Sequence, residues 1–328
     1  MEAAVRESLP SPEGAPLSLS SSLLEGLVLG AKGSIPFAIR ENFRDLGVIH
    51  ILVVSGLHVG FIFCLFGLLF GSLPLRWRAG LAVPWVCLYV LITGAGSPAA
   101  RAGLMAVALS LADVLNRPRN LWTAVAFSAL CLLLANPLSL FQAGFQLSYL
   151  IVLSIVALAP VFSSLLLFIP ARFRPWLAVP LAAQAGSLPL TAHYFQAFSP
   201  LALVANLLVI PLAALIVNLG FLALLAGLIS APLALILNYP NRALIALVLG
   251  IVSFLSRLPG SSLRAAFASP PVVLAWYLAL LGLSRRRSFS GRRLRAAAFA
   301  AAVLLVALSG RWLRRPGPGL EAVFFNGE

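Results

Sequence analysis

The chain has 328 residues, of which 61% are apolar and only 10% are charged, and its mean hydropathy is +1.02. A soluble domain carries roughly 25% charged residues, so this chain lacks the charge to cover a water-facing surface. Continuous apolar runs such as 201–228 exclude a membrane β-barrel, whose strands alternate apolar and polar residues. The composition therefore predicts an all-α, polytopic integral membrane protein, because in lipid the backbone satisfies its hydrogen bonds internally.

A helix that crosses a bilayer needs about 20 apolar residues, with a range of roughly 17–25. About ten segments approach this length, and several are short enough to be broken or re-entrant helices. In chain order the candidate spans are 49–71, 79–95, 99–115, 121–135, 145–168, 175–191, 200–228, 243–258, 271–284 and 294–310. We therefore expect a helical bundle with about ten transmembrane segments.

The net charge of +14 comes almost entirely from arginine. Arginines gather in alternate loops between the predicted spans, which favours a role in orientation over nucleic-acid binding when charge alone is considered. The positive-inside rule places these loops in the cytoplasm and both termini outside. The loops carry Arg76 and Arg78, Arg117 and Arg119, Arg172 and Arg174, Arg242, and the tract 285–295.

Residues 1–48 are expected to form an outward N-terminal segment. They carry early acidic residues and a Ser/Pro-rich stretch, in place of the basic start and compact apolar core of a signal peptide. Within them, residues 18–29 have the composition of a short amphipathic helix that lies on the membrane surface.

The densest group of polar residues inside a predicted span lies at the start of the first one. His50, Ser55 and His58 stand in the stretch 50–60, with Gly56 next to the serine. Ionisable groups in hydrocarbon are costly and mark functional sites by default. A local break at Ser55 and Gly56 would let the three side chains converge on one polar cavity. Alternatively, both histidines bond to neighbouring helices and only hold the bundle together.

Arg101 begins the third predicted span after a Gly/Ser/Pro break at 93–98, and Pro98 suits the first turn of the new helix. The arginine either snorkels to the interface or points into a pore, where it meets an anion. Asp113, the one acidic residue within a predicted span, is expected to pair with a nearby arginine as a structural contact.

Two further places combine a polar side chain with a proline. Asn136 and Pro137 precede Gln146, and Asn206 lies shortly before Pro211, whose missing N–H frees a backbone carbonyl one turn earlier. Broken helices with freed carbonyls line transport pathways in many membrane proteins, and they also occur as ordinary kinks. The predicted helix breaks are Pro98, Pro137 and Pro211.

The sequence contains no catalytic or metal-binding cluster. Its three histidines are His50, His58 and His193, and a catalytic zinc usually needs three protein ligands. Ser55 has no neighbouring acid to orient a histidine, which argues against a nucleophilic triad. A phosphate-binding loop of the Walker type is also missing. We therefore expect no enzyme activity, no metal and no cofactor, and any energy for transport has to come from outside the chain.

The order of these motifs resembles the ComEC competence family, the DNA channel of natural transformation in the bacterial inner membrane. The string His50-x-x-x-x-Ser55-Gly56-Leu57-His58 looks like the signature of that family. Three later blocks follow in the family's order, at 93–102, 136–149 and 205–211. The resemblance covers residues 23–228, with weaker agreement to residue 308.

The resemblance implies a channel through which one DNA strand passes from the outer face to the cytoplasm. It also implies a DNA receptor of the ComEA type outside and a cytoplasmic ATPase of the ComFA type as partners. Membrane lipid is a further partner on composition, and a homo-oligomer is left open. The candidates for the DNA path are His50, Ser55, Gly56, His58, Arg101, Gln146 and Asn206, with Tyr194 and Phe195 as candidates for stacking bases.

Two domains of the full-length family pattern have no counterpart in the sequence. They are the N-terminal oligonucleotide-binding domain and the C-terminal metallo-β-lactamase-like domain. Residues 321–326 look like the first strand of the latter, so 49–310 are expected to form the channel domain and 311–328 the truncated start of the next. Without its metal ligands the chain is not expected to degrade DNA.

Two alternative functions remain open at this point. One is a secondary transporter of a small solute or lipid, which would usually show internal repeats. The other is a non-functional membrane remnant of a truncated gene.

Overall fold

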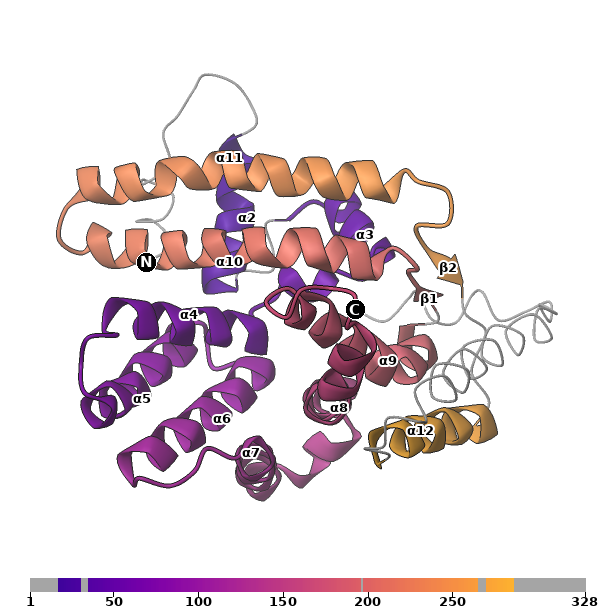
Figure 1. Cartoon of the computed structure of the whole chain (residues 1–328). Helices are drawn as coiled ribbons and strands as arrows, with labels where there is room; N and C mark the ends of the chain where they lie inside the picture. Colours follow the sequence, from indigo (N-terminus) through magenta and orange to yellow (C-terminus); the bar gives the residue numbers. More distant parts are fainter. Residues whose placement is uncertain (1–16, 31–34, 196, 265–269, 286–328) are drawn as a thin grey trace.

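The computed structural model describes residues 17–30, 35–195, 197–264 and 270–285, which form a bundle of helices with a short pair of strands (Figure 1). The helices are α2 Leu17–Leu29, α3 Phe37–Asp45, η1 Ile49–Ile51, α4 Gly56–Leu69, α5 Leu75–Ile92, α6 Ser97–Val114, α7 Leu121–Ala135, η2 Pro137–Phe141, α8 Ala143–Leu165, α9 Arg174–Phe195, α10 Ala202–Gly227, α11 Ala231–Ser256 and α12 Pro270–Arg285. The strands β1 Ala197–Phe198 and β2 Leu263–Arg264 pair in antiparallel fashion.

A long hairpin of α10 and α11 lies on one side of the bundle, and α2 crosses it (Figure 1). The crossing is close because Gly220 of α10 has no side chain. A Cβ at this position would lie 2.6 Å from Cγ2 of Val28 and 3.2 Å from Cδ1 of Leu24. Of the other helices, α4 packs with α5 and α6, α7 packs on α6, and α8 packs with α9.

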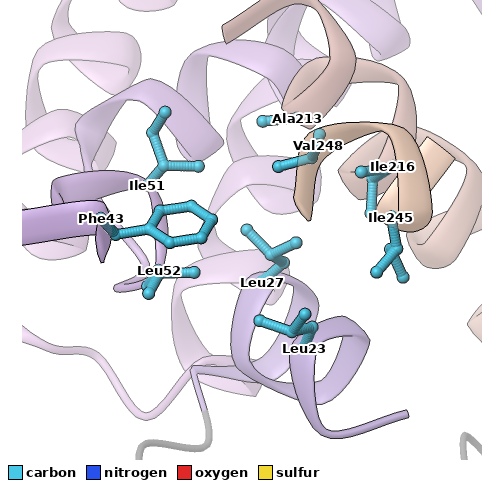
Figure 2. A pocket seen from close by; sticks show the side chains of 9 residues that line it. All are labelled: Leu23, Leu27, Phe43, Ile51, Leu52, Ala213, Ile216, Ile245 and Val248. Atoms are coloured by element: carbon cyan, nitrogen blue, oxygen red, sulfur yellow. The ribbon is translucent and has the colours of Figure 1, made fainter. Parts of the chain in front are cut away.

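An apolar core fixes η1 and the start of α4 at the place where α2, α3, α10 and α11 meet (Figure 2). The cavity between its side chains measures about 10 Å³, which is no more than a single water needs, and its apolar lining keeps it dry. The side chains that converge there are Leu23, Leu27, Phe43, Ile51, Leu52, Ala213, Ile216, Ile245 and Val248. This packing holds Leu52 and thereby positions Ser55 three residues later.

Four helices in the described part of the chain, α5, α8, α10 and α11, are long and apolar enough to cross a membrane. Two more, α4 and α7, are apolar but have 14 and 15 residues, which span only about 21–23 Å of a roughly 30 Å hydrocarbon core. The expected total of about ten membrane spans is therefore not confirmed. The predicted span at 294–310 lies outside the described residues.

The start of α11 was predicted incorrectly from the sequence. A span was expected at 243–258 with Arg242 in the loop before it, whereas the helix begins at Ala231 and runs through Pro240. The polar residues before residue 243 lie within the helix. Asn241 donates a hydrogen bond of 2.9 Å to Asn238 there, so these side chains partner each other instead of facing water in a loop. Arg242 is therefore a helical, half-buried residue, and its use as a loop charge was wrong.

Two of the three predicted proline breaks coincide with helix boundaries. Pro98 occupies the first turn of α6, and Pro137 opens η2 between α7 and α8. Pro211, in contrast, lies inside α10, which continues on both sides of it. The prediction of a break there was wrong, because a proline removes one hydrogen bond but the packing of a buried helix can hold the remainder together.

The helix expected at 18–29 is present as α2, but it is not arranged as a surface helix with one polar face. Six consecutive residues, from Leu23 to Val28, are all buried, including Glu25. Contacts with α10 and α11 surround this stretch. The helix therefore belongs to the core that holds η1.

Candidate functional site

Ser55 caps the N-terminus of α4 and orients His58. The serine hydroxyl accepts a hydrogen bond of 3.3 Å from the backbone N–H of Leu57, and it lies 3.1 Å from Nδ1 of His58. The backbone N–H of Ser55 also donates to that nitrogen, at 3.3 Å. This is a capping box in which a histidine takes the place usually held by Glu or Gln. The predicted break at Ser55 and Gly56 is confirmed by the start of the helix.

The cap determines which nitrogen of His58 carries the proton. Because Nδ1 accepts from a backbone N–H, the neutral ring has its proton on Nε2. The side chain is 0% exposed and Nε2 has no hydrogen-bond partner. His58 therefore presents a buried donor that an incoming acceptor or a water molecule would satisfy.

The beginning of α4 lies directly against α6. A Cβ on Gly56 would be 3.2 Å from the Cβ of Ala102, the residue after Arg101. On the next position of α6, a Cβ on Gly103 would be 3.0 Å from Cγ2 of Val90 in α5. Gly56 thus allows the start of α4 to lie against α6 beside Arg101, and Gly103 allows α5 to pack closely on the same helix.

Arg101 is buried and has incomplete hydrogen bonding. Its Nη1 donates 2.7 Å to Oγ of Ser97, its Nη2 donates 3.0 Å to the carbonyl of Gly144 in α8, and its Nε has no partner. The residue is only 2% exposed. It does not snorkel to the surface in the structure, and it joins two of the predicted motifs, which are 43 residues apart.

The acidic residue on the same helix does not neutralise Arg101. Asp113 forms an ion pair with Arg119 and accepts hydrogen bonds from its Nε at 2.7 and 2.9 Å. These hydrogen bonds to Asp113 raise the pKa of the Arg119 guanidinium above its ordinary value. Asp113 therefore has the structural pairing expected from the sequence, and the charge of Arg101 stays uncompensated by it.

An aromatic ring supports the guanidinium. The Cζ atom of Arg101 lies 6.0 Å from the ring centroid of Tyr149, at the limit for a cation–π contact. The tyrosine is held by Ser128, whose Oγ donates to the carbonyl of Val125 at 3.1 Å and is 2.9 Å from the phenol oxygen. Since the serine proton is used, the tyrosine hydroxyl donates to Ser128.

Gln146 connects the start of α8 to η2 and α9. Its Nε2 donates 3.0 Å to the carbonyl of Leu140, and its Oε1 accepts 2.7 Å from the hydroxyl of Tyr194. Phe195, the other residue considered for base stacking, is 58% exposed.

These contacts place several of the predicted residues on neighbouring helices, and we call this group the polar seam. It runs across α4, α6, α8 and α9 and consists of Ser55, His58, Arg101, Gly144, Gln146 and Tyr194. His50 lies in η1, is exposed, and forms no hydrogen bond with the Ser55–His58 cap. Asn206 lies in α10 with its Oδ1 buried and without a partner, and no hydrogen bond joins it to the seam.

Sequence reasoning missed the residues that hold Arg101 in place. Ser128 stands alone in an apolar helix and reaches the arginine only through Tyr149, so nothing local marks it. Ser97 was detectable, because it precedes Arg101 by four residues and therefore lies on the same helix face. Within the described ranges, no group of three or more His, Cys, Asp or Glu residues is placed to hold a metal ion.

Comparison with known proteins agrees with the motif order. The sequence model of the Competence protein family matches residues 27–289. The chain is 34% identical over 197 residues to ComE operon protein 3 of Bacillus subtilis (strain 168), covering 58% of this chain and 24% of that protein. It is 26% identical over 240 residues to the uncharacterized protein YcaI of Escherichia coli (strain K12), covering 66% of this chain and 30% of that protein.

No solved structure matches the chain. The chain spans less than a third of the length of either relative. The family match nevertheless extends over most of the described helices and includes every residue of the polar seam. On this evidence, and in agreement with the resemblance seen in its motifs, the chain belongs to the Competence protein family.

Proposed function

We propose that the chain forms a membrane pathway through which a single DNA strand enters the cytoplasm during natural transformation. Membership of the Competence protein family supports a role in competence. The four apolar helices of membrane-spanning length support a membrane location, which we take to be the bacterial inner membrane with several passes. The passage of a single strand is the finer part of the proposal and rests on the polar seam.

The observation that carries the proposal is the buried, uncompensated charge of Arg101. A charge removed from water is strongly destabilising unless it is paired, so its retention between three helices needs a reason other than stability. A phosphodiester supplies the missing acceptor, because guanidinium groups bind phosphate oxygens through several N–H donors. The free Nε of Arg101 is such a donor.

The remaining seam residues suit a strand of any sequence. Tyr194 is 37% exposed, and aromatic rings stack on every base regardless of its identity. His58 and Gln146 add hydrogen-bonding groups without net charge. Such a path holds phosphates by electrostatics and tolerates all bases, as transport of arbitrary DNA requires.

The further expectations belong to the same proposal. A DNA receptor of the ComEA type would deliver DNA on the outer side, where we place both termini, and an ATPase of the ComFA type would act from the cytoplasm. The seam contacts lie within one chain, so the proposal does not require association with a second copy.

The test is DNA uptake in a transformable host that carries the chain in place of its own family member. Arg101→Gln removes the charge but keeps a polar side chain beside Ser97, and it should reduce internalised labelled strand by at least tenfold while surface-bound DNA stays constant. Arg117→Ala removes one exposed arginine of the α6–α7 loop and serves as the matched control. Normal uptake by the Arg101→Gln protein at normal membrane levels would exclude this mechanism, and normal uptake after complete deletion would favour a small-solute transporter.

A further inference from the structure

A pocket on α3, separate from the polar seam, has the chemistry of a nucleotide site. Its volume is about 290 Å³, near the roughly 300 Å³ at which small-molecule sites begin. One wall is α3 and the opposite wall is η1 with the two residues after it. The lining residues are Ile35, Phe37, Arg40, Glu41, Arg44, Ile49, Leu52 and Val53.

The four α3 residues of the pocket lie on one face of the helix. Phe37, Arg40, Glu41 and Arg44 are spaced i, i+3, i+4 and i+7, which places them in one stripe. All four are exposed, and Phe37 is 67% exposed. The opposite side of the helix is anchored by Phe43, which is 1% exposed. The stripe is therefore presented outward on a helix that the core already holds.

The charged groups of this stripe have no partners. Among the described residues, neither Arg40, Arg44 nor Glu41 has an ion-pair or hydrogen-bond partner for its side chain. Oppositely charged neighbours on a helix usually pair at little cost, yet here two guanidinium groups and one carboxylate all face the open pocket. Their full hydrogen-bonding capacity is available to a ligand.

We propose that this pocket binds one nucleotide of the incoming single DNA strand before the strand reaches the seam. This inference rests on the proposed function and extends it to a receiving site. Arg40 and Arg44 bind the phosphates on either side of the nucleotide, and Phe37 stacks on its base. Glu41 accepts a hydrogen bond from an N–H donor on the base edge, which is an amino group or, in thymine, the ring N3–H.

Two features favour a nucleotide over the phosphate of a lipid headgroup, which the arginines could also bind. A carboxylate between the two guanidinium groups repels a simple anion, whereas every DNA base offers an N–H donor that a carboxylate can accept from. In addition, the pocket lies near the seam along the chain, because its wall residue Val53 lies two residues before Ser55. A strand held here is delivered to the N-terminus of α4.

The experiment measures binding of a fluorescent single-stranded oligonucleotide to the full chain in nanodiscs of zwitterionic lipid, over a series of salt concentrations. A plot of the logarithm of the DNA-binding constant against the logarithm of the salt concentration has a negative slope. Each lost phosphate contact should reduce the magnitude of that slope by about 0.7. The Arg40→Ala/Arg44→Ala protein should lose two such contacts. The Arg76→Ala/Arg117→Ala protein loses the same charge from exposed positions in the first turn of α5 and in the α6–α7 loop, and it should keep the slope of the unmodified chain.

A second variant tests stacking without changing charge. Phe37→Ala should weaken binding by at least about fivefold and Phe37→Trp should retain it, because stacking contributes about 1–3 kcal/mol per base. All these positions are exposed, so the thermal midpoint of each protein should match that of the unmodified chain. An unchanged slope in the double arginine variant, or unchanged affinity in Phe37→Ala, overturns the proposal.

The remaining comparisons distinguish a nucleotide site from a lipid site, and failure of this proposal from failure of the proposed function. If the Arg40→Ala/Arg44→Ala protein instead loses binding to vesicles that contain anionic phosphatidylglycerol and keeps DNA binding, the pocket is a lipid site and the proposal is wrong. If these variants bind DNA normally while Arg101→Gln still blocks uptake, the receiving site fails and the proposed function stands. If the unmodified chain neither binds nor takes up DNA, both fail together.

Discussion

The hydroxyl of Tyr194 donates a hydrogen bond of 2.7 Å to Oε1 of Gln146 and thereby ties the end of α9 to the beginning of α8. Gln146 uses its other amide group to hold the carbonyl of Leu140 in η2. Three segments, η2, α8 and α9, therefore depend on one side chain of the polar seam.

Replacing Tyr194 by Phe removes one hydrogen bond and keeps the ring. We expect a loss of about 0.5–1.5 kcal/mol in stability, read as a lower thermal midpoint of the chain in nanodiscs. Gln146→Leu should be more damaging, because it also leaves the Leu140 carbonyl without its donor. Equal midpoints for the two variants would show that the η2 contact contributes nothing.

Ser55→Ala removes the cap of α4. The expected cost is about 0.5–2 kcal/mol, typical for loss of an N-terminal capping side chain. Because His58 also loses a neighbour of Nδ1, its ring should become mobile, which the imidazole resonances of a labelled protein would report. Ser55→Thr retains the hydroxyl and is the control. A rigid His58 in the alanine variant would contradict the assignment of the capping box.

Trp276 of α12 donates 2.8 Å to the carbonyl of Ala185 in α9. That carbonyl has no helical donor, because position 189 is a proline and lacks the N–H that would reach it. Trp276→Phe should therefore cost about 1–3 kcal/mol, the penalty for a buried unsatisfied acceptor. In a Pro189→Ala background the helix can satisfy the carbonyl itself.

A double-mutant cycle on Trp276 and Pro189 measures this dependence directly. The tryptophan replacement should cost less in the Pro189→Ala background than in the unmodified chain. Strictly additive changes in the thermal midpoints would mean that α12 is held by packing alone.

The contact between α8 and α9 is close enough to make Gly186 irreplaceable. A Cβ there would lie 1.8 Å from Oγ of Ser154 and 2.3 Å from its Cβ. Gly186→Ala should destabilise the bundle by about 1–3 kcal/mol or more, as overpacking does, and lower the yield of membrane-inserted protein. Gly250→Ala in α11 meets nothing within 4 Å and should be neutral or stabilising. Similar behaviour of the two variants would show that the helices readily separate.

Local signals in the sequence were sufficient where the deciding contact is local. α7 was expected at 121–135 and spans Leu121–Ala135, because Asn120 caps its first turn. The break at Ser55 was likewise readable, since the capping partner lies three residues away. The start of α11 was not, because its polar run looks like a loop until Asn238 and Asn241 are placed opposite the small residue Gly220.

In the candidate site too, local features were predictable from the sequence and long-range contacts were not. A polar residue inside an apolar span is visible in the sequence, and this identified Arg101 and Gln146. The bond from Arg101 to Gly144 crosses 43 residues, and the one from Tyr194 to Gln146 crosses 48, so only the packing of helices reveals them. Asn206 carries the same kind of sequence signal as Gln146, yet α10 places it without a hydrogen bond to the seam.

The glycine contacts at Gly56 and Gly103 decide where the protein can move. With less than a methyl group of free space on either side, α6 has no room to slide or turn between α4 and α5, and these three helices behave as one rigid wall. The glycine at 186 locks α8 to α9 in the same way. The hydrogen bond from Arg101 to Gly144 joins the two walls, so if the proposed strand passes between them, this bond has to break.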